Sequence, residues 1–252
     1  MTPTVAVRGR LAEHPLWARA LGADGLAARL ILPVIVSASV EDRERVEGAG
    51  GLERLSLTEL VREARRASQA GLAGLLLFGA TDRKDETALL ASDRDHIVPR
   101  AIRAVKQAVP DLAVATDVCV CAYTAHGQCV LFGNGGAAVA ATLERLQAIA
   151  AVHAEAGADL LIPSGMLDGS VGALRRALTG DLAAVPVAAM AKLESSLYAT
   201  HRVAVGAVPI AERAVPLLST ESEGPARARA RRDLADGADA VVVKPGLPAL
   251  DL

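Results

Sequence analysis

The sequence contains very few aromatic residues, and this shortage limits how its core can be built. Phe, Trp and Tyr together make up 2% of the 252 residues, whereas 52% of the chain is hydrophobic. The core must therefore be packed mainly with Val, Leu, Ile and Ala, which suit layers of strands and helices. A chain of this length and apolar content can bury a large core, as one domain or as two.

Long apolar runs and strongly basic patches are also lacking, which excludes two classes of function. No apolar run approaches the roughly 18 residues of a membrane span, and residues 1–10 lack the apolar core of a signal peptide. The net charge is −2, and the basic cluster at 227–232 is typical of a solvated helix face. We therefore expect a cytoplasmic protein that binds neither membranes nor nucleic acids.

Cysteine is equally scarce, but the three cysteines of the chain lie in one short stretch. Asp117–Cys129 reads Asp-Val-Cys-Val-Cys-Ala-Tyr-Thr-Ala-His-Gly-Gln-Cys and contains Cys119, Cys121 and Cys129. Their thiols can converge on one point if the segment turns back, which Gly127 makes easy. Three thiolates favour zinc, and a zinc ion with three protein ligands keeps a fourth position open for water or substrate.

Two simpler interpretations of the cysteines remain open: ordinary buried side chains, or a redox pair. Core cysteines scattered by chance would not share one turn. A Cys-x-Cys pair is badly placed for a relaxed disulfide, because alternate residues of a strand lie near the upper limit of the Cα separation. Clustered thiols also fit a reducing compartment better than a secreted disulfide scaffold.

Six short apolar segments separated by helical patterns predict parallel strands. A helix stop, an apolar run and a break recur at 71–79, 157–165 and 237–246. Further strands are expected at 30–36, 112–118 and 185–189. The expected helices are 14–20, 56–70, 100–109, 138–156, 169–178 and 225–235. Such alternation of strand and helix requires a parallel sheet in an α/β fold.

Polar residues follow the strands at their carboxyl ends, which favours a barrel over an open sheet. An open dinucleotide-binding sheet would have a Gly-x-Gly-x-x-Gly turn after its first strand, and the sequence has none there. A TIM (β/α)8 barrel instead distributes its site over several strand ends. The candidates are Asp117 with the cysteines, Ser164, Lys192 and Lys244.

The chain is therefore expected to be a TIM (β/α)8-type barrel truncated to about six βα units. Residues 30–252 would form this incomplete catalytic barrel, and residues 1–29 would precede it as an N-terminal arm. Six strands cannot close an eight-stranded barrel, so we expect unpaired backbone groups on the first and sixth strands. Another chain or oligomer contacts would have to cover this gap, or the fold would be unstable.

Lysine is rare, and two of the four lysines follow apolar strands. The 27 basic residues include only Lys84, Lys106, Lys192 and Lys244. An amine against apolar surroundings loses hydration, which favours its neutral, nucleophilic form. Lys192 and Lys244 are therefore candidates for Schiff-base formation with a ketone. The simpler alternative is that each lysine reaches solvent, but two such lysines in so lysine-poor a chain favour chemistry.

Four segments resemble motifs of the porphobilinogen synthases, also called 5-aminolevulinate dehydratases. The cysteine stretch is similar to the metal loop of that family, with unbroken spacing. The segment after Lys192 resembles the family's first lysine motif, with Tyr198 and Arg202 at the same offsets. Lys244-Pro-Gly-Leu-Pro-Ala-Leu-Asp resembles the second. The segment 163–169 is also similar to a family motif, with Gly165 in place of an Asp.

The resemblance implies an enzyme that condenses two molecules of 5-aminolevulinate into porphobilinogen, in porphyrin and heme biosynthesis. In that family two lysines form Schiff bases with the two substrates, which gives these roles to Lys192 and Lys244. Asp117 and Ser164 would assist at the second lysine. Zinc on the three cysteines would hold the amine of the other substrate.

The resemblance also implies a substrate carboxylate site and an assembly. Arg202 and Arg213 would bind the carboxylate, with Tyr198 beside them in the substrate site. An N-terminal arm mediates oligomer assembly in the family, so we expect a homo-oligomer. In the family two more strands follow the sixth and carry a serine and a tyrosine that bind the other carboxylate.

Two functions from different classes thus stay open. The first is the porphobilinogen synthase reaction or a closely related one. The second is a catalytically impaired zinc-binding homologue that needs a partner chain to complete its barrel. A single-lysine aldolase is a weaker third interpretation, because it leaves the cysteines unexplained. We expect the isolated chain to bind zinc and form an imine at Lys192, but to make porphobilinogen poorly.

Overall fold

Six parallel strands form the centre of the molecule. The computed structural model describes residues 9–133 and 135–250. The six strands are β1 (Ile31–Ser37), β4 (Gly74–Ala80), β5 (Ala113–Asp117), β8 (Leu160–Ile162), β9 (Ala188–Lys192) and β10 (Ala240–Lys244). Each lies beside the next in chain order, and a single bridge between Leu161 and Val187 joins β8 to β9. The barrel-type α/β fold and the six predicted strands are confirmed, but the strand expected at 185–189 lies three residues later, at Ala188–Lys192.

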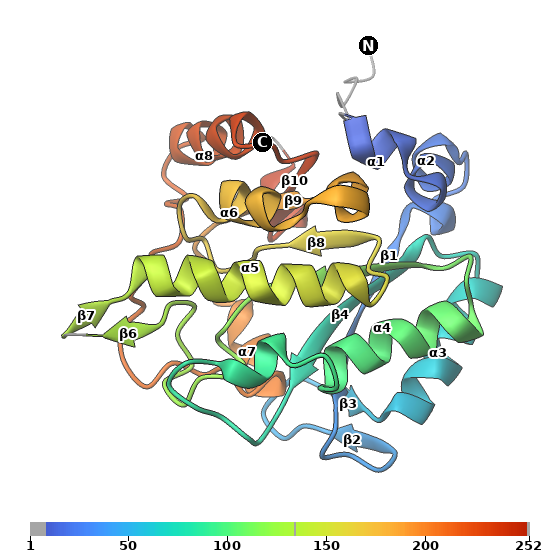
Figure 1. Cartoon of the computed structure of the whole chain (residues 1–252), viewed down its shortest axis with the longest axis horizontal. Coiled ribbons are helices and arrows are strands. Elements are labelled where there is room, and N and C mark those ends of the chain that lie inside the picture. The colour runs from blue at the N-terminus through green and yellow to red at the C-terminus, as the bar shows by residue number, and fades with distance from the viewer. Residues whose placement is uncertain (1–8, 134, 251–252) are drawn as a thin grey trace.

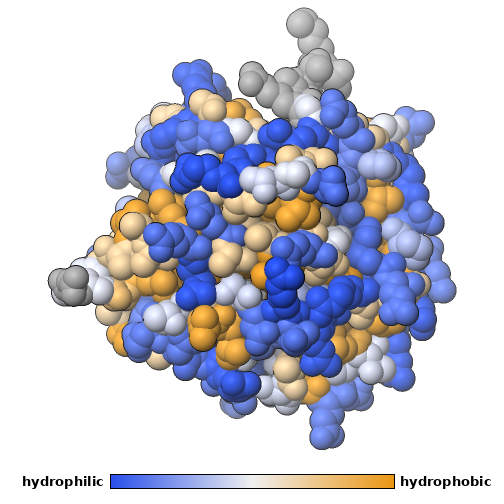
Figure 2. All heavy atoms as spheres, in the orientation of Figure 1, coloured by the Kyte–Doolittle hydropathy of each residue, from blue (hydrophilic) through white to orange (hydrophobic). Residues whose placement is uncertain are grey.

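Helices cover the outer side of this curved sheet (Figure 1). They are α3 (Leu57–Gln69), α4 (Ile97–Ala108), α5 (Val139–Glu155), α6 (Ser170–Ala177) and α8 (Gly224–Ala235). Ser56 caps α3 as predicted, because its Oγ accepts a hydrogen bond from Glu59 N at 3.3 Å. Figure 2 shows mostly hydrophilic side chains over α3, as expected for a helix that buries one apolar face. Among the described residues, none of the helices has both the length and the hydropathy of a membrane-crossing segment.

Two N-terminal helices pack against the amino-terminal ends of the strands. These are α1 (Gly9–Glu13) and α2 (Pro15–Gly22). Leu11 and Trp17 share one buried cluster with inward-facing residues such as Ala113 and Leu160. The Trp17 indole also donates to the carbonyl of Asp159 at 2.7 Å. The described part of the predicted arm therefore lies on the barrel, at the end opposite to the predicted site.

Two aspartates at the start of strands fix the register of neighbouring strands. The Asp159 carboxylate accepts a hydrogen bond from Val114 N at 2.8 Å, and Asp159 N donates to Val114 O at 2.8 Å. Asp239 makes the same pair of bonds with Val187, at 2.9 and 2.8 Å. Both belong to a repeated Gly-Ala-Asp segment. The repeat thus encodes more than a helix stop, because its carboxylate joins adjacent strands.

A hairpin after β1 was not predicted. It comprises β2 (Arg43–Arg45) and β3 (Glu53–Leu55), and β3 pairs in parallel with the last part of β1 through Ile35 and Val36. The expectation of an unpaired first strand is therefore wrong over this part. Among the described residues β10 pairs only with β9, as expected for the sixth strand.

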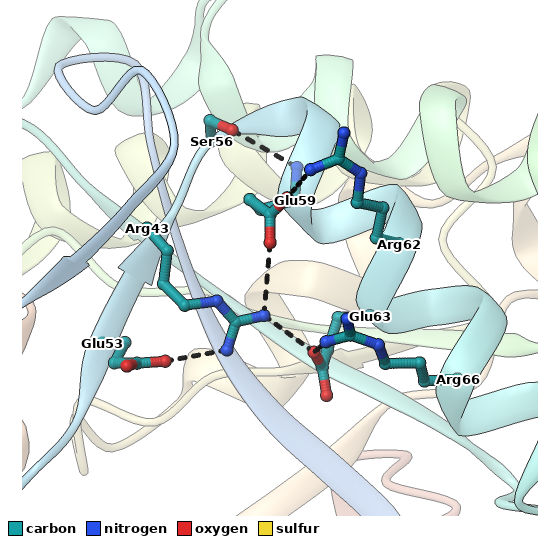
Figure 3. Close-up of polar contacts among 7 residues, drawn as sticks. All are labelled: Arg43, Glu53, Ser56, Glu59, Arg62, Glu63 and Arg66. Atoms are coloured by element: carbon teal, nitrogen blue, oxygen red, sulfur yellow. Dashed lines mark hydrogen bonds and ion pairs between the residues drawn. The ribbon is translucent and has the colours of Figure 1, made fainter.

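Ion pairs, together with the buried side chain of Leu55, hold this hairpin to α3, and one apolar residue among charged ones gives no strand pattern in the sequence. The Arg43 guanidinium lies 2.8 Å from Glu53, 2.9 Å from Glu63 and 3.4 Å from Glu59 (Figure 3). The Arg43 guanidinium donates hydrogen bonds to the carboxylates of Glu53 and Glu63, and these bonds raise the pKa of the guanidinium further above its usual value. Alternating apolar residues are the sequence signal of a half-buried strand, and this charged segment does not show that alternation.

We expect replacement of Asp159 by Ala to lower the free energy of unfolding by about 3 kcal/mol. The substitution leaves the Lys106 ammonium, 2.9 Å from Asp159, and the Val114 amide without their partner. Urea unfolding at neutral pH measures the change. Asp24→Ala, at an exposed position, is the matched control and should change it by less than about 0.5 kcal/mol.

The same variant should show a defined pH dependence. Burial favours the protonated form of Asp159, but hydrogen bonds from His14, Lys106 and Val114 outweigh it and lower the pKa of this carboxyl. A lowered pKa stabilises the fold above the pKa of the unfolded chain, about 4, and this contribution is lost as the pH falls further. The difference between wild type and Asp159→Ala should therefore shrink below about pH 4. A difference that stays constant from pH 7 to pH 3 would contradict this role.

Candidate active site

The carboxyl ends of the strands open into one pocket. Nine of the ten predicted site residues line it: Asp117, Cys121, Cys129, Ser164, Lys192, Tyr198, Arg202, Arg213 and Lys244. The tenth, Cys119, lies against Cys121, with 3.4 Å between their sulfur atoms. This is the end of the barrel at which TIM-barrel enzymes carry their active sites.

The two candidate lysines end adjacent strands. Lys192 is the last residue of β9 and Lys244 the last of β10, and their Cα atoms are partners in the parallel ladder. Each lysine thus belongs to its strand, whereas the sequence pattern placed it just after the strand. The ring centroid of Tyr198 lies 5.7 Å from Lys192 Nζ and 5.4 Å from Lys244 Nζ. Both amines therefore reach the same part of the pocket.

Burial and like charge favour the neutral form of Lys244. Burial lowers the pKa of the Lys244 amine, the positive charge of Lys192 lowers it further, and Asp117 acts in the opposite direction. Lys192 Nζ donates a hydrogen bond to the carbonyl of Ser164 at 3.0 Å, so its position is fixed by β8 and the turn that follows. A neutral amine beside a positioned one is suited to attack on carbonyl groups.

Asp117 ends β5 beneath these amines. Burial raises the pKa of Asp117 to about 6, although the Ser164 hydroxyl and the charge of Lys192 act against this rise. A carboxyl group whose pKa lies this close to neutrality can both accept and release a proton near pH 7. Asp117 and Ser164 therefore lie where the sequence placed them, next to the lysine ends.

Tyr198 binds the protein backbone through its hydroxyl and faces the amines with its ring. Its Oη lies 2.8 Å from the carbonyl of Leu193 and 2.6 Å from that of Lys244. Burial raises the pKa of Tyr198 to about 12, so the phenol stays protonated. The hydroxyl thus ties β9 to β10, and the ring is the part of Tyr198 that the pocket exposes.

A short helix, α7 (Tyr198–Ala204), carries further pocket residues and was not predicted. Its Arg202 donates through Nη1 to the carbonyls of Gly127 and Ala207, at 3.2 and 2.7 Å, and its Nη2 lies 3.6 Å from Cys129 Sγ. Arg213 reaches the pocket from the irregular segment after α7. Burial and the nearby charge of Arg202 lower the pKa of the Arg213 guanidinium.

His201 is a pocket residue that the sequence pattern missed. Its ring packs edge-on against Phe78, with 4.6 Å between centroids. Burial, followed by the charges of Lys244 and Lys192, lowers the pKa of His201 to about 4, so the imidazole is neutral at pH 7. A single histidine without the spacing of metal ligands cannot be recognised in the sequence as a site residue. Only the folded helix brings His201 close to the lysines.

The three cysteines converge as predicted. Their sulfur atoms all lie within 4.8 Å of one another. Gly127 makes the return possible, because its φ is +65° and an added Cβ would lie 2.4 Å from Val208 O. Hydrogen bonds from Cys119 and Cys121 lower the pKa of Cys129. The set offers three soft donors to one ion, which is a donor set that zinc favours.

Gly165 keeps space beside the sulfur atoms. A Cβ at this position would lie 3.3 Å from Cys129 Cβ and 3.7 Å from Cys119 Sγ. Any larger side chain would crowd the thiols, so the turn after β8 and the cysteine loop are matched in shape.

Sequence comparison relates the chain to one protein family. A family profile described as delta-aminolevulinic acid dehydratase matches residues 9–252. The delta-aminolevulinic acid dehydratase of Methanothermus sociabilis is 37% identical over 226 residues, which cover 88% of this chain and 70% of that relative. The Escherichia coli protein of the same name is 36% identical over 225 residues, covering 88% of this chain and 69% of its own length.

A solved structure supports the same comparison. Delta-aminolevulinic acid dehydratase from Toxoplasma gondii, in complex with its reaction product porphobilinogen, aligns with a TM-score of 0.84 at 29% sequence identity. The alignment covers 98% of this chain and 73% of that one. The chain thus spans about 70% of the length of the relatives that it matches.

Purified protein is expected to carry about one zinc ion per chain, and the double variant Cys119→Ser/Cys121→Ser to lose it, because one thiolate alone holds zinc weakly. Metal analysis by mass spectrometry measures the content. Circular dichroism should show that the variant keeps its fold, since neither hydroxyl changes the volume greatly. Full metal retention in the double variant would refute the cysteine site.

Proposed function

Because this chain belongs to the delta-aminolevulinic acid dehydratase family, we propose that it condenses two molecules of 5-aminolevulinate into porphobilinogen, a step of tetrapyrrole biosynthesis. The observation that carries the proposal is the pairing of Lys192 with Lys244 at the mouth of one pocket that also contains the cysteines. Two amines in register can hold two ketone substrates side by side. Adjacent strands lie about 4.8 Å apart, a separation that suits bond formation between two tethered molecules.

Each lysine amine attacks the ketone carbon of one 5-aminolevulinate and expels its oxygen as water, which leaves an imine. Lys244 is prepared for attack by its burial beside Lys192. Asp117, at the end of β5, can take the proton that the attacking amine releases and return it to the leaving oxygen. Holding both substrates covalently replaces an encounter of two free molecules by a reaction within one site.

Arginine side chains supply the carboxylate site. Arg202 already donates to the carbonyls of Gly127 and Ala207, so Arg213 is the more available donor for a substrate carboxylate. Arg213 lines the same pocket as the lysines, and a guanidinium binds a carboxylate through two parallel hydrogen bonds. The Tyr198 ring would pack against the substrate chain between them.

The cysteine loop would hold the metal of this reaction. Cys119, Cys121 and Cys129 offer three thiolates to zinc, which supplies a Lewis acid with one open position when bound. The pocket-facing sulfur atoms belong to Cys121 and Cys129. These two residues would therefore present a bound metal to the pocket of the lysines. The homo-oligomer implied by the resemblance stays a prediction.

Protein supplied with zinc and 5-aminolevulinate should form a pyrrole, measured by a colorimetric pyrrole assay. Lys244→Met should lower this rate on the order of 10³-fold or more, because no covalent intermediate can form there. Borohydride added during turnover should trap the imine, and peptide mass spectrometry should locate the adduct on Lys192 or Lys244. Lys84 and Lys106 serve as internal controls in the same digest.

The outcomes separate the two functions. Zinc binding and a trapped imine without any pyrrole would favour the catalytically impaired zinc-binding homologue. Adducts confined to Lys84 or Lys106, or no adduct at all, would refute the assignment of both active-site lysines.

The charge of Lys192 should control the pH at which Lys244 reacts. Lys192→Met removes a positive charge that lowers the pKa of Lys244, so the amine stays protonated to higher pH. Imine trapping on Lys244 should therefore begin at higher pH in Lys192→Met than in wild type. Lys192→Arg keeps the charge and is the matched control, which should follow the wild-type profile. Identical profiles for Met and Arg would show that the two lysines are not coupled.

A further inference from the structure

The side chain of Gln128 joins the cysteine loop to the segment that carries Arg213. Its Nε2 donates to the carbonyls of Glu212 at 2.8 Å and Ala211 at 3.4 Å. Its Oε1 accepts a hydrogen bond from Ala214 N at 3.1 Å. Gln128 is only 4% exposed. One buried amide thus holds the backbone on both sides of Arg213.

Backbone contacts reinforce this junction. The carbonyl of His126 accepts a hydrogen bond from Ile210 N at 3.3 Å. Gly127 approaches Val208 so closely that no Cβ would fit between them. The residues just before Cys129 therefore lie directly against the residues just before Arg213.

The segment that carries Arg213 has little other support. Residues 205–217 form neither helix nor strand between α7 and the bridge from Leu193 to Leu218. Val205 and Ala207 are buried in the core, but beyond them Val208 is 54% exposed and Ile210 is 80% exposed, so apolar burial contributes little over 208–217. A segment with few buried apolar contacts opens at low free-energy cost. Its position therefore depends strongly on its hydrogen bonds to residues 126–128.

We propose that Gln128 is a positioning residue that couples metal binding at the cysteines to the placement of Arg213. Gln128 immediately precedes Cys129, so a metal ion that fixes Cys129 also fixes the backbone from which the Gln128 amide reaches residues 211–214. The guanidinium of Arg213 then stays in the pocket, ready for a carboxylate. The carboxylate role rests on the proposed function, whereas the mechanical coupling does not.

Coupling of this kind is reciprocal. If metal binding orders the Arg213 segment, then a ligand that holds Arg213 in the pocket must strengthen metal binding by the same factor. The protein would thus bind its carboxylate substrate well only when the cysteine site is loaded. An unloaded protein would be left with a loosened carboxylate site.

Hydrogen–deuterium exchange of wild type and Gln128→Leu, each with and without zinc, tests the coupling. In wild type, zinc should slow exchange of the 207–217 amides about tenfold or more, because the loss of three hydrogen bonds costs at least about 1.4 kcal/mol. In Gln128→Leu this zinc effect should vanish at 207–217 but persist at 119–133. Gln107→Leu, the same change on the exposed side of α4, should behave as wild type.

A graded variant and a kinetic measurement complete the test. Gln128→Glu keeps the acceptor for Ala214 N but loses both donors, so its exchange should lie between those of wild type and Gln128→Leu. Zinc content should stay near one per chain in both variants. KM for 5-aminolevulinate should rise about tenfold in Gln128→Leu while kcat changes less than about threefold, since a carboxylate anchor acts on binding.

The exchange result decides the coupling whether or not a pyrrole is formed. Equal exchange at 207–217 with and without zinc in wild type would overturn it, as would a persistent zinc effect in Gln128→Leu. If Gln128→Leu does not fold, the wild-type comparison and Gln128→Glu still decide. Coupled exchange in a protein that makes no pyrrole would leave the coupling intact and count against the proposed function alone.

Discussion

The register of β10 on β9 is the constraint on which the candidate active site depends. Lys192 and Lys244 are partners in this ladder, and a shift of one residue would turn one of them to the opposite face of the sheet. Asp239 fixes the register at the other end of the strands through its two hydrogen bonds with Val187. Arg175 and Arg10 neutralise the buried carboxylate. Hydrogen bonds about five residues before the two lysines thus determine which face of the sheet the lysine side chains occupy.

The repulsion between the two lysine amines of the site makes it easier for Lys244 to lose its proton. Two charged ammonium groups in one pocket repel each other, so loss of one proton relieves the repulsion. The charge of Asp117 moderates this effect, and the ring of Tyr198 faces both amines. An amine with a lowered pKa beside a carboxyl with a raised pKa suits imine formation near pH 7.

Local patterns predicted the parts of the structure that depend on local burial. Apolar runs, three of them bounded by glycine, predicted the six strands, and scarcity singled out the lysines and the cysteines. The hairpin β2–β3 escaped because ion pairs such as Arg43 with Glu53 hold it. Gln128 escaped because its partners lie 83 to 86 residues further along the chain. Its neighbours in sequence carry no trace of these contacts. His201 was not predicted, because α7 is short and the His201 ring meets Phe78 and the lysines only in the folded chain.

The pocket therefore combines two kinds of support. Strand ends carry the lysines and Asp117 and are held by a continuous buried core, so these groups keep their positions without any ligand. Arg213 stands on an irregular, largely exposed segment, and the hydrogen bonds on both sides of it run to the cysteine loop. A site built this way keeps its nucleophiles in place permanently, whereas its carboxylate anchor depends on the loop that gathers the thiols. The short segment that gathers the cysteines thus links the site of the reacting lysines to the binding of the substrate carboxylate.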